Sequence, residues 1–223
     1  MEKFKFHNFF IQIMLLSYSK TINLLEKYDF KPADHFFFES RAELSHGIRL
    51  LEPPYVLKIV SPDVLHKTDL GFVQTNLHSE QECEKAYYSM LFKAKELKIR
   101  VRGFLLQHQY SGLELILGGK RDVQFGSVVL FGIGGIFTEI YKDFSLRIFP
   151  FSKEEALEMI SEIKASKLLE GYRGLKKVDK DVLSSSLCQL GVLLEENKKI
   201  KEIDLNPCFI EKECIVADAR IIV

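Results

Sequence analysis

The middle of this chain constrains its fold most, because three apolar runs punctuated by glycine follow one another there. They predict strands at residues 103–107, 113–119 and 128–132. A fourth strand is expected at 55–60, two short ones at 200–205 and 214–219, and helices at 19–28, 79–98, 152–163 and 181–196. Strands and helices alternate irregularly, without the even rhythm of a Rossmann domain. The pattern therefore predicts an α+β chain.

Two local signals refine the expected element ends. Ser79 is a plausible N-cap for the 79–98 helix, and Glu82 three residues later completes a capping-box pattern. A turn that follows Asn206-Pro207 is expected between the last two strands, since both residue types favour turns.

Composition excludes several classes of protein. The 223 residues suggest one or two domains, and 47% hydrophobic with 28% charged residues is enough to bury a core, which excludes disordered and collagen-like chains. Because 31 Lys and Arg balance 31 Asp and Glu, a polyanion such as nucleic acid is not expected as the main partner.

The cysteines and the N-terminal segment indicate a protein of the cytoplasm. Four scattered cysteines without a CxxC pair predict free, mostly buried thiols rather than a disulfide framework or a zinc site. The apolar run 9–16 contains Gln12 and is too short to span a membrane. Residues 1–18 are therefore expected to form an N-terminal extension.

One strand and the loop after it contain candidate catalytic groups. Lys58 stands inside the apolar run 55–60, where a charge is costly unless it has a partner. It can reach phosphate oxygens, or point to solvent from an edge strand. The polar loop 61–71 contains His66, which can act as acid, base, ligand or phosphate acceptor.

Two further segments add oxygen ligands and backbone donors. Residues 131–139 form a glycine-rich turn that either approaches phosphate or simply joins two strands, and they match neither common phosphate-binding motif. Asp204, Asn206 and Asp218 stand at the ends of the last two strands and offer oxygens that suit Mg²⁺, with an Asx turn as the alternative. Together with the strand lysine, these groups point toward a nucleotide and Mg²⁺.

Six segments together resemble the β subunit of ADP-forming acetyl-CoA (acyl-CoA) synthetases, which belong to the ATP-grasp superfamily and are related to the succinyl-CoA synthetase β subunit. They are VLKIVSPDVLHKTDLG at 56–71, GKRDVQFG at 119–126, FGIGGIF at 131–137, LLEGYRG at 168–174, DLNP at 204–207 and VADAR at 216–220. The resemblance runs in the family's order from about Ser19 to Val223.

This resemblance implies a fold, a reaction and a partner. The fold would be ATP-grasp, with an N-terminal lobe at 19–100, a C-terminal lobe at 101–223 and nucleotide bound between them. The reaction converts acyl-CoA, ADP and phosphate into acid, CoA and ATP through a phosphohistidine relay. The implied partner is a CoA-binding α subunit, in an α2β2 heterotetramer of the cytoplasm.

The resemblance also implies roles for single residues. His66 would take part in the phosphoryl relay, with Asp204 steadying the phosphohistidine. Asn206 and Asp218 would bind Mg²⁺, and ADP/ATP would be the nucleotide substrate. The residues implied to contact the nucleotide are Lys58, Gln107, His108, Glu114 and Arg147.

Two departures from the family's pattern leave alternatives open. His108 replaces the usual Glu, and Phe72 replaces a second glycine, where it would crowd a loop near the phosphates. A non-catalytic or regulatory ATP-grasp subunit is therefore the alternative function. An ATP-grasp ligase that activates a carboxylate directly is a third possibility, against which the loop histidine argues.

Overall fold

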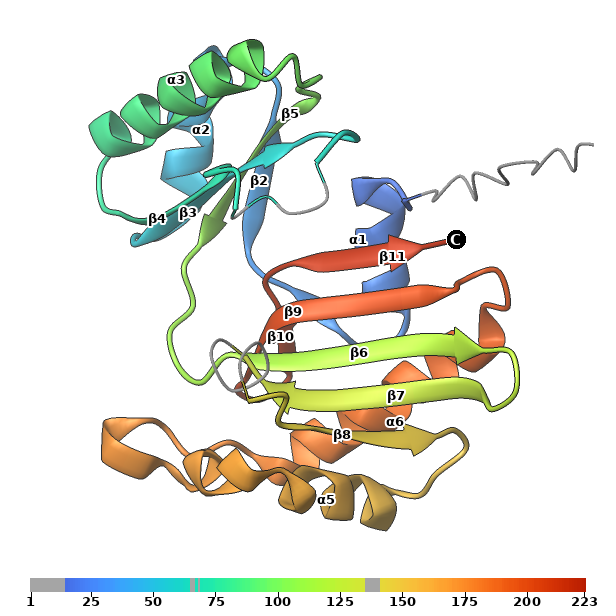
Figure 1. Cartoon of the computed structure of the whole chain (residues 1–223). Helices are drawn as coiled ribbons and strands as arrows, with labels where there is room; N and C mark the ends of the chain where they lie inside the picture. Colours follow the sequence, from blue (N-terminus) through green and yellow to red (C-terminus); the bar gives the residue numbers. More distant parts are fainter. Residues whose placement is uncertain (1–14, 65–66, 68, 135–140) are drawn as a thin grey trace, which may run out of the picture.

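Two β-sheets, each with its own apolar core, form the two lobes of the protein (Figure 1). The structure is a computed structural model, and it describes residues 15–64, 67, 69–134 and 141–223. The smaller lobe contains β2 (His35–Phe38), α2 (Arg41–Leu50), β3 (Tyr55–Val60), β4 (Val73–Leu77), α3 (Glu80–Glu96) and β5 (Gly103–His108). Its antiparallel sheet has the order β2-β5-β3-β4, so β3 is an interior strand.

The larger lobe is built on a seven-stranded sheet. Its strands are β1 (Lys31–Pro32), β6 (Leu115–Asp122), β7 (Gly126–Ile133), β8 (Phe144–Ile148), β9 (Glu202–Ile210), β10 (Cys214–Val216) and β11 (Ala219–Ile222). The order is β1-β10-β9-β6-β7-β8, and β11 also pairs with β9. Its helices are α1 (Tyr18–Lys27), α5 (Lys153–Glu162) and α6 (Lys180–Glu196), with 3₁₀ turns η1 (Lys164–Glu170) and η2 (Tyr172–Gly174).

Side-chain alternation along the strands builds both cores. In the smaller lobe, Leu57 and Ile59 of β3 face the helices α2 and α3 together with Phe104 of β5. In the larger lobe, α6 packs on β6 and β7 so closely that a Cβ at Gly119 would lie 2.4 Å from Leu194 Cδ1. Both lobes therefore keep one sheet face under helices (Figure 1).

The first described helix packs with the larger lobe. Leu25 of α1 and the following Tyr28 and Phe30 belong to the same core cluster as residues of α5 and α6, and β1 pairs in parallel with β10. The boundaries expected at 18/19 and 100/101 stay predictions. The packing differs from them in one respect, because α1 buries apolar side chains in the larger core and β1 pairs with a strand of the larger sheet.

Most expected elements agree with the structure, and the strand predicted at 55–60 has the bounds of β3. Among the described residues, the α-helix α2 and the strands β1, β2, β4 and β8 were not predicted, and the single strand expected at 214–219 is divided into β10 and β11. Ser79 caps α3 by accepting a hydrogen bond from the Glu82 amide at 3.3 Å, but the Glu82 carboxylate accepts from the His78 amide at 2.6 Å instead of closing the expected capping box. A complete capping box instead starts α5, between Ser152 and Glu155.

The turn expected after Asn206-Pro207 lies at residues 211–213, between β9 and β10. The Asx turn considered at Asn206-Pro207 itself is not formed, because β9 continues through both residues to Ile210. The partners of β9 explain why a proline fits there. β11 pairs with residues 202–205, β10 pairs with residues 208–210, and the register against β6 shifts between these two parts. Pro207 thus stands where the ladder changes partner, so its missing amide hydrogen breaks no regular pairing.

Two expectations from composition can be compared with the described residues. All four cysteines are free thiols, and three of them are buried, as predicted. Within the part of the chain that the structure describes, no helix is long and apolar enough to cross a lipid bilayer.

Phe72 has a structural role that differs from the one expected for it. Its side chain is fully buried in the core of the smaller lobe, where it packs among residues of β3, β5 and α3. Its amide donates to the Lys67 carbonyl at 2.8 Å, and its carbonyl accepts from the Ile59 amide at 3.1 Å. The side chain therefore fills the core and does not crowd the space between the lobes.

We expect Phe72→Ala to lower the free energy of unfolding by about 3–5 kcal/mol, because it leaves a cavity in a closed core. Urea denaturation followed by circular dichroism measures this. The matched control is Phe92→Ala on α3, whose side chain is 65% exposed and should matter little. Equal loss of stability in the two variants would contradict the assignment of Phe72 to the core.

Candidate functional site

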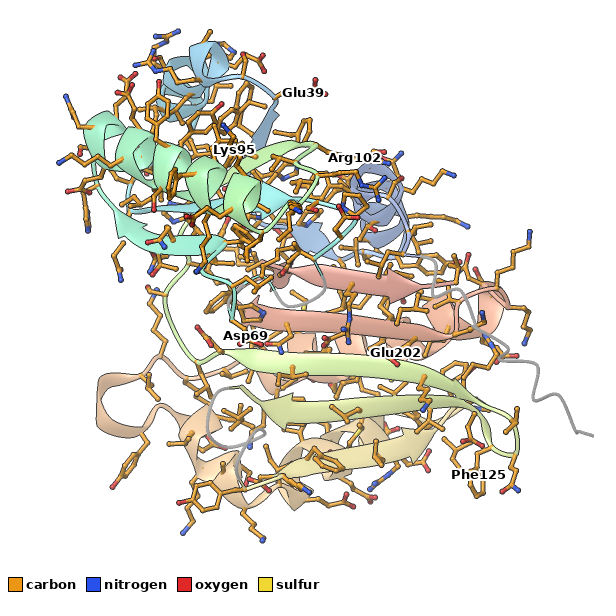
Figure 2. All side chains as sticks on the ribbon, turned by 45° about the horizontal axis from the view of Figure 1, so that its top comes forward. Glu39, Asp69, Lys95, Arg102, Phe125 and Glu202 are labelled. Atoms are coloured by element: carbon orange, nitrogen blue, oxygen red, sulfur yellow. The ribbon has the colours of Figure 1, made fainter. Side chains whose placement is uncertain are left out.

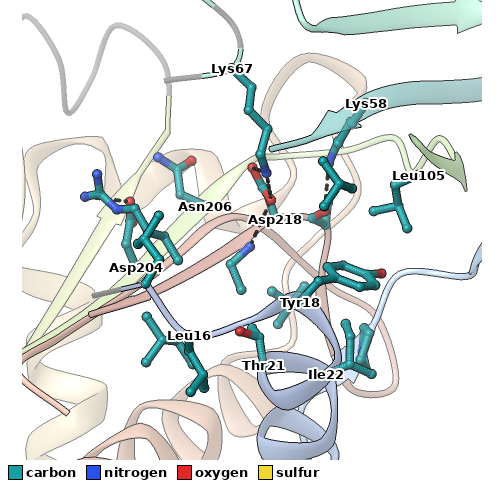
Figure 3. A pocket seen from close by; sticks show the side chains of 18 of the residues that line it. Leu16, Tyr18, Thr21, Ile22, Lys58, Lys67, Leu105, Asp204, Asn206 and Asp218 are labelled. Atoms are coloured by element: carbon teal, nitrogen blue, oxygen red, sulfur yellow. Dashed lines mark hydrogen bonds and ion pairs between the residues drawn. The ribbon is translucent and has the colours of Figure 1, made fainter. Parts of the chain in front are cut away.

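A cavity of about 540 Å³ lies between the two lobes (Figure 3). The smaller lobe contributes β3, the segment after it and β5, while the larger lobe contributes α1, β9 and the chain from β10 to β11. Asp69, in the segment after β3, also lines it and lies beside the larger sheet in Figure 2. Residues far apart in the sequence therefore meet around one space.

Lys58 points into this cavity from an interior strand. Its neighbours Leu57 and Ile59 face the apolar core, so alternation turns Lys58 to the other face of the sheet, where it is only 5% exposed. Its ammonium donates to the Ala217 carbonyl of the larger lobe at 2.8 Å. Burial lowers the pKa of Lys58 to about 8, while the Asp218 charge opposes this effect and Lys67 adds to it. The exposed edge-strand alternative is wrong.

Asp218 lies in the break between β10 and β11 and receives Lys67 from the other lobe. The Lys67 ammonium lies 2.8 Å from Oδ1 and 3.1 Å from Oδ2 of Asp218. Burial alone would raise the pKa of this carboxyl group. The charges of Lys58 and Lys67, with hydrogen bonds from Lys67 and the Ala219 amide, outweigh burial and lower the pKa of Asp218. Asp218 is therefore held as a carboxylate.

Asp204 and Asn206 lie on the same face of β9, since Leu205 between them is buried in the core. The backbone N–H of Asn206 donates to the backbone carbonyl of Asp218 at 3.0 Å, which fixes the spacing of these two residues. Arg220 lies opposite Asp204 in the β9–β11 ladder, with its guanidinium 3.7 Å from the Asp204 carboxylate. All four residues line the cavity.

The other predicted nucleotide contacts are divided between the cavity and other places. Gln107 lines the cavity and donates to the Ala217 carbonyl at 3.2 Å. The His108 ring contacts the Glu52 carbonyl and Tyr110 instead. Glu114 is exposed beside Gly134, and Arg147 pairs with Glu162 of α5. The structure does not bring these last three side chains to the cavity.

Two predicted features lie outside the described residues. They are His66, and residues 135–139 of the glycine-rich segment 131–139. The flanks of the loop are placed, however: the Arg100 guanidinium and amide bind Asp63, and the Arg100 hydrogen bonds lower the pKa of Asp63 to about 2. This pair ties the start of the loop to the strand that follows α3.

Sequence reasoning gave no role to three residues of the cavity. Lys67 directly follows His66, and Arg220 lies two residues after Asp218, so strand alternation puts it on the same side. These positions could have identified both residues. Tyr18 gave no such signal. Its hydroxyl is buried with no hydrogen-bond partner among the described residues, and burial first, then Asp218, raises its pKa.

The chemistry of the cavity suits a ligand that carries both phosphate and a divalent cation. Lys58, Lys67 and Arg220 supply positive charge for phosphate oxygens. Asn206 and Asp218 supply oxygens of the kind that hard cations prefer. No group of three or more His, Cys, Asp or Glu side chains able to hold a metal exists among the described residues. A metal here would thus share its coordination with the ligand.

Comparison with known proteins decides the family. The family model of the ATP-grasp domain matches residues 12–223. Over 173 residues the chain is 44% identical to the β subunit of ADP-forming acetate–CoA ligase I from Pyrococcus furiosus, covering 76% of this chain and 75% of that subunit. The chain belongs to the ATP-grasp family of ADP-forming acetate–CoA ligase β subunits.

Solved structures agree with this family. The ATP-grasp chain superposes on acetyl-coenzyme A synthetase 1 from Ca. Korarchaeum cryptofilum, in complex with coenzyme A and Ca-AMPCP, with a TM-score of 0.87 and 39% identity, covering 95% of this chain and 93% of that one. Another structure of that enzyme contains Mg-AMPPCP and a phosphohistidine segment pointing towards the nucleotide-binding site; it matches with a TM-score of 0.78 and 36% identity, covering 94% and 92% of the two chains.

These relatives confirm the predicted family, the α+β ATP-grasp fold and the enzyme class, which is that of the ADP-forming acid–thiol ligases. Some relatives are longer. The acetate–CoA ligase I of Archaeoglobus fulgidus is 38% identical over 203 residues, which are 89% of this ATP-grasp chain but 30% of that enzyme.

We expect Lys58 to make stability depend on pH. In the folded ATP-grasp chain its pKa is about 8, whereas an unfolded lysine titrates near pH ~10.4. Between these values the unfolded chain binds more protons, so this residue makes the free energy of unfolding rise with pH, by at most about 1.4 kcal/mol per pH unit.

Lys58→Met removes this contribution. The stability advantage of the variant over the wild type should be largest below pH ~8 and should shrink as the pH rises towards ~10. Thermal and urea unfolding across this range measure it, with Lys120→Met, which removes an exposed lysine of β6, as the control. Parallel curves for wild type and Lys58→Met would contradict the buried ammonium.

Proposed function

We propose that this chain is the nucleotide-binding subunit of an ADP-forming acyl-CoA synthetase and makes ATP by transferring a phosphoryl group from histidine to ADP. One observation supports this most: Lys58, Asn206 and Asp218 line one cavity between two lobes (Figure 3). The similarity to acetate–CoA ligase β subunits supplies the overall reaction, in which acyl-CoA, ADP and phosphate become acid, CoA and ATP.

The residues fit Mg²⁺. Asp218 is held as a carboxylate, and it accepts a cationic group, the Lys67 ammonium, on both of its oxygens. Asn206 is fixed beside it by the hydrogen bond between their backbones. Mg²⁺ commonly takes one or two protein oxygens and completes its shell with phosphates and water. When bound, it would neutralise charge on the phosphates of the nucleotide.

Lys58 would hold a phosphate of ADP. Its ammonium has three donors, and the Ala217 carbonyl takes one of them, so others can reach phosphate oxygens. β3 and the core beneath it fix the backbone and the Cβ of Lys58. This favours phosphate binding, because the side chain loses little conformational entropy when it binds. Gln107 donates to the same Ala217 carbonyl as Lys58, and it would be a second residue that contacts the nucleotide.

The transfer itself would use His66 and Asp204. The N–P bond of a phosphohistidine breaks while an oxygen of the ADP β-phosphate forms the new P–O bond, and the electron pair of the broken bond stays on the ring nitrogen. Such a transfer needs positioning and neutralised charge more than covalent chemistry from the protein. Asp204 would orient the ring, and Arg220 opposite it limits where its carboxylate can point. His108, Glu114 and Arg147 stay predicted contacts of the wider cleft.

A CoA-binding α subunit is the proposed partner. The relatives of similar length are named as β subunits, and the longer relatives contain the matching part as 30% of one chain or less. In the remainder of the reaction, phosphate displaces CoA from acyl-CoA to give an acyl phosphate, which passes its phosphoryl group to a histidine and releases the acid. These steps would therefore lie on another chain. We propose an α2β2 heterotetramer in the cytoplasm.

Asp218→Asn should weaken the Mg²⁺-dependent part of nucleotide binding. In the wild type, Mg-ADP at ~100 times its dissociation constant should stabilise the fold by about 2.7 kcal/mol. The variant should gain less from Mg-ADP than the wild type and respond little to Mg²⁺ when ADP is already present. Thermal-shift titration measures both. Asp181→Asn, a carboxylate outside this cavity, is the control and should behave like the wild type.

His66→Ala should abolish ATP formation from acyl-CoA, ADP and phosphate when the α subunit is present, since the relay then lacks its phosphoryl acceptor. ADP binding should persist, because the cavity keeps Lys58 and Asp218. A coupled ATP assay and a parallel ADP titration separate the two effects, with the exposed His78→Ala as control. Wild-type turnover in His66→Ala would remove this histidine from the mechanism.

A further inference from the structure

The strongest unassigned feature of the cavity is the ion pair between Lys67 and Asp218. It joins the two lobes, because Lys67 follows β3 of the smaller lobe and Asp218 lies between β10 and β11 of the larger one (Figure 3). The ammonium contacts both carboxylate oxygens, at 2.8 and 3.1 Å, and the two side chains are 26% and 36% exposed. Contact with both oxygens in a half-buried setting distinguishes this pair from a mobile surface pair.

Lys67 competes with a metal for the same oxygens. Under the proposed function, Asp218 binds Mg²⁺, and a divalent cation at this carboxylate would lie close to the Lys67 ammonium. The two positive charges would repel each other in a half-buried cavity, where repulsion is stronger than in water. Lys58, the other cation near Asp218, avoids the conflict because its ammonium donates to the Ala217 carbonyl instead.

We infer that Lys67 is a positioning residue that occupies the metal-binding carboxylate of Asp218 and moves to phosphate when metal and nucleotide bind together. This inference rests on the proposed function, since it takes Asp218 as a metal ligand. Lys67 keeps the Asp218 carboxylate aimed into the cavity. It also blocks metal binding when no phosphate is present to receive the displaced ammonium.

The inference has a thermodynamic consequence. Without nucleotide, a metal has to break the ion pair and displace the Lys67 ammonium from its carboxylate. With ADP in the cavity, the ammonium exchanges the carboxylate for a phosphate oxygen, so displacement costs less. Metal and nucleotide should therefore bind cooperatively through Lys67, and each should strengthen the other by the same factor.

Mn²⁺ titration in the absence and presence of ADP tests this coupling, with free Mn²⁺ followed by electron paramagnetic resonance. Lys67→Met should bind Mn²⁺ without ADP about tenfold more tightly than the wild type, within the usual range of coupling. The gain in Mn²⁺ affinity that ADP brings should shrink by a similar factor. Lys67→Arg, which keeps the charge, should resemble the wild type, as should Lys95→Met on the outer surface of α3 (Figure 2).

Each outcome decides a separate point. Unchanged Mn²⁺ affinity and unchanged coupling in Lys67→Met overturn the role of Lys67. Failure of the wild type to bind Mn²⁺ even with ADP, or wild-type binding by Asp218→Asn, overturns the metal site and with it the proposed function. If Lys67→Met does not fold, Lys67→Gln removes the same charge with a polar side chain, and its Mn²⁺ titration decides in the same way.

Discussion

The hydrogen bond from the buried Lys58 ammonium to the Ala217 carbonyl is the interaction on which the arrangement of this protein depends. It unites the two lobes at one backbone group, and Gln107 donates to the same carbonyl. Lys67 reaches the next residue, Asp218. Three polar side chains of the smaller lobe thus meet two consecutive residues of the larger one. A charge is tolerated inside β3 because this contact satisfies it across the cavity.

The larger sheet places the acidic side of the cavity through two neighbouring irregularities. The strand expected at 214–219 is interrupted between β10 and β11, which frees Ala217 and Asp218 from the ladder. The adjacent part of β9 passes through Asn206-Pro207, where its partner changes from β11 to β10. Two backbone hydrogen bonds join these irregular segments, from Asn206 to Asp218 and from Ala217 to Pro207. Interruption of regular pairing therefore creates the site without leaving its backbone groups unpaired.

Stability and function use different faces of the same strands. In β3, Leu57 and Ile59 belong to the core while Lys58 faces the cavity; in β9, Leu205 is buried while Asp204 and Asn206 face it. Phe72 contributes to stability rather than to the cavity, since its side chain fills the smaller core. A departure from the family's sequence pattern is thus accommodated in packing, and the charged groups of the cavity are unaffected by it.

The sequence by itself determined the main helices, the strand around Lys58, the family and most of the charged residues of the site, because these depend on local periodicity and on motifs whose residues are adjacent. It did not determine β1 and β2, which pair with strands far away in the chain. Nor did it determine α2, β4 and β8, which bury few side chains and therefore carry little apolar periodicity. Only the tertiary structure decided that Arg147 pairs with Glu162 away from the cavity and that Lys67 binds Asp218. The first contact depends on how α5 packs beside β8, and the second depends on how the two sheets approach each other. No local pattern encodes either arrangement.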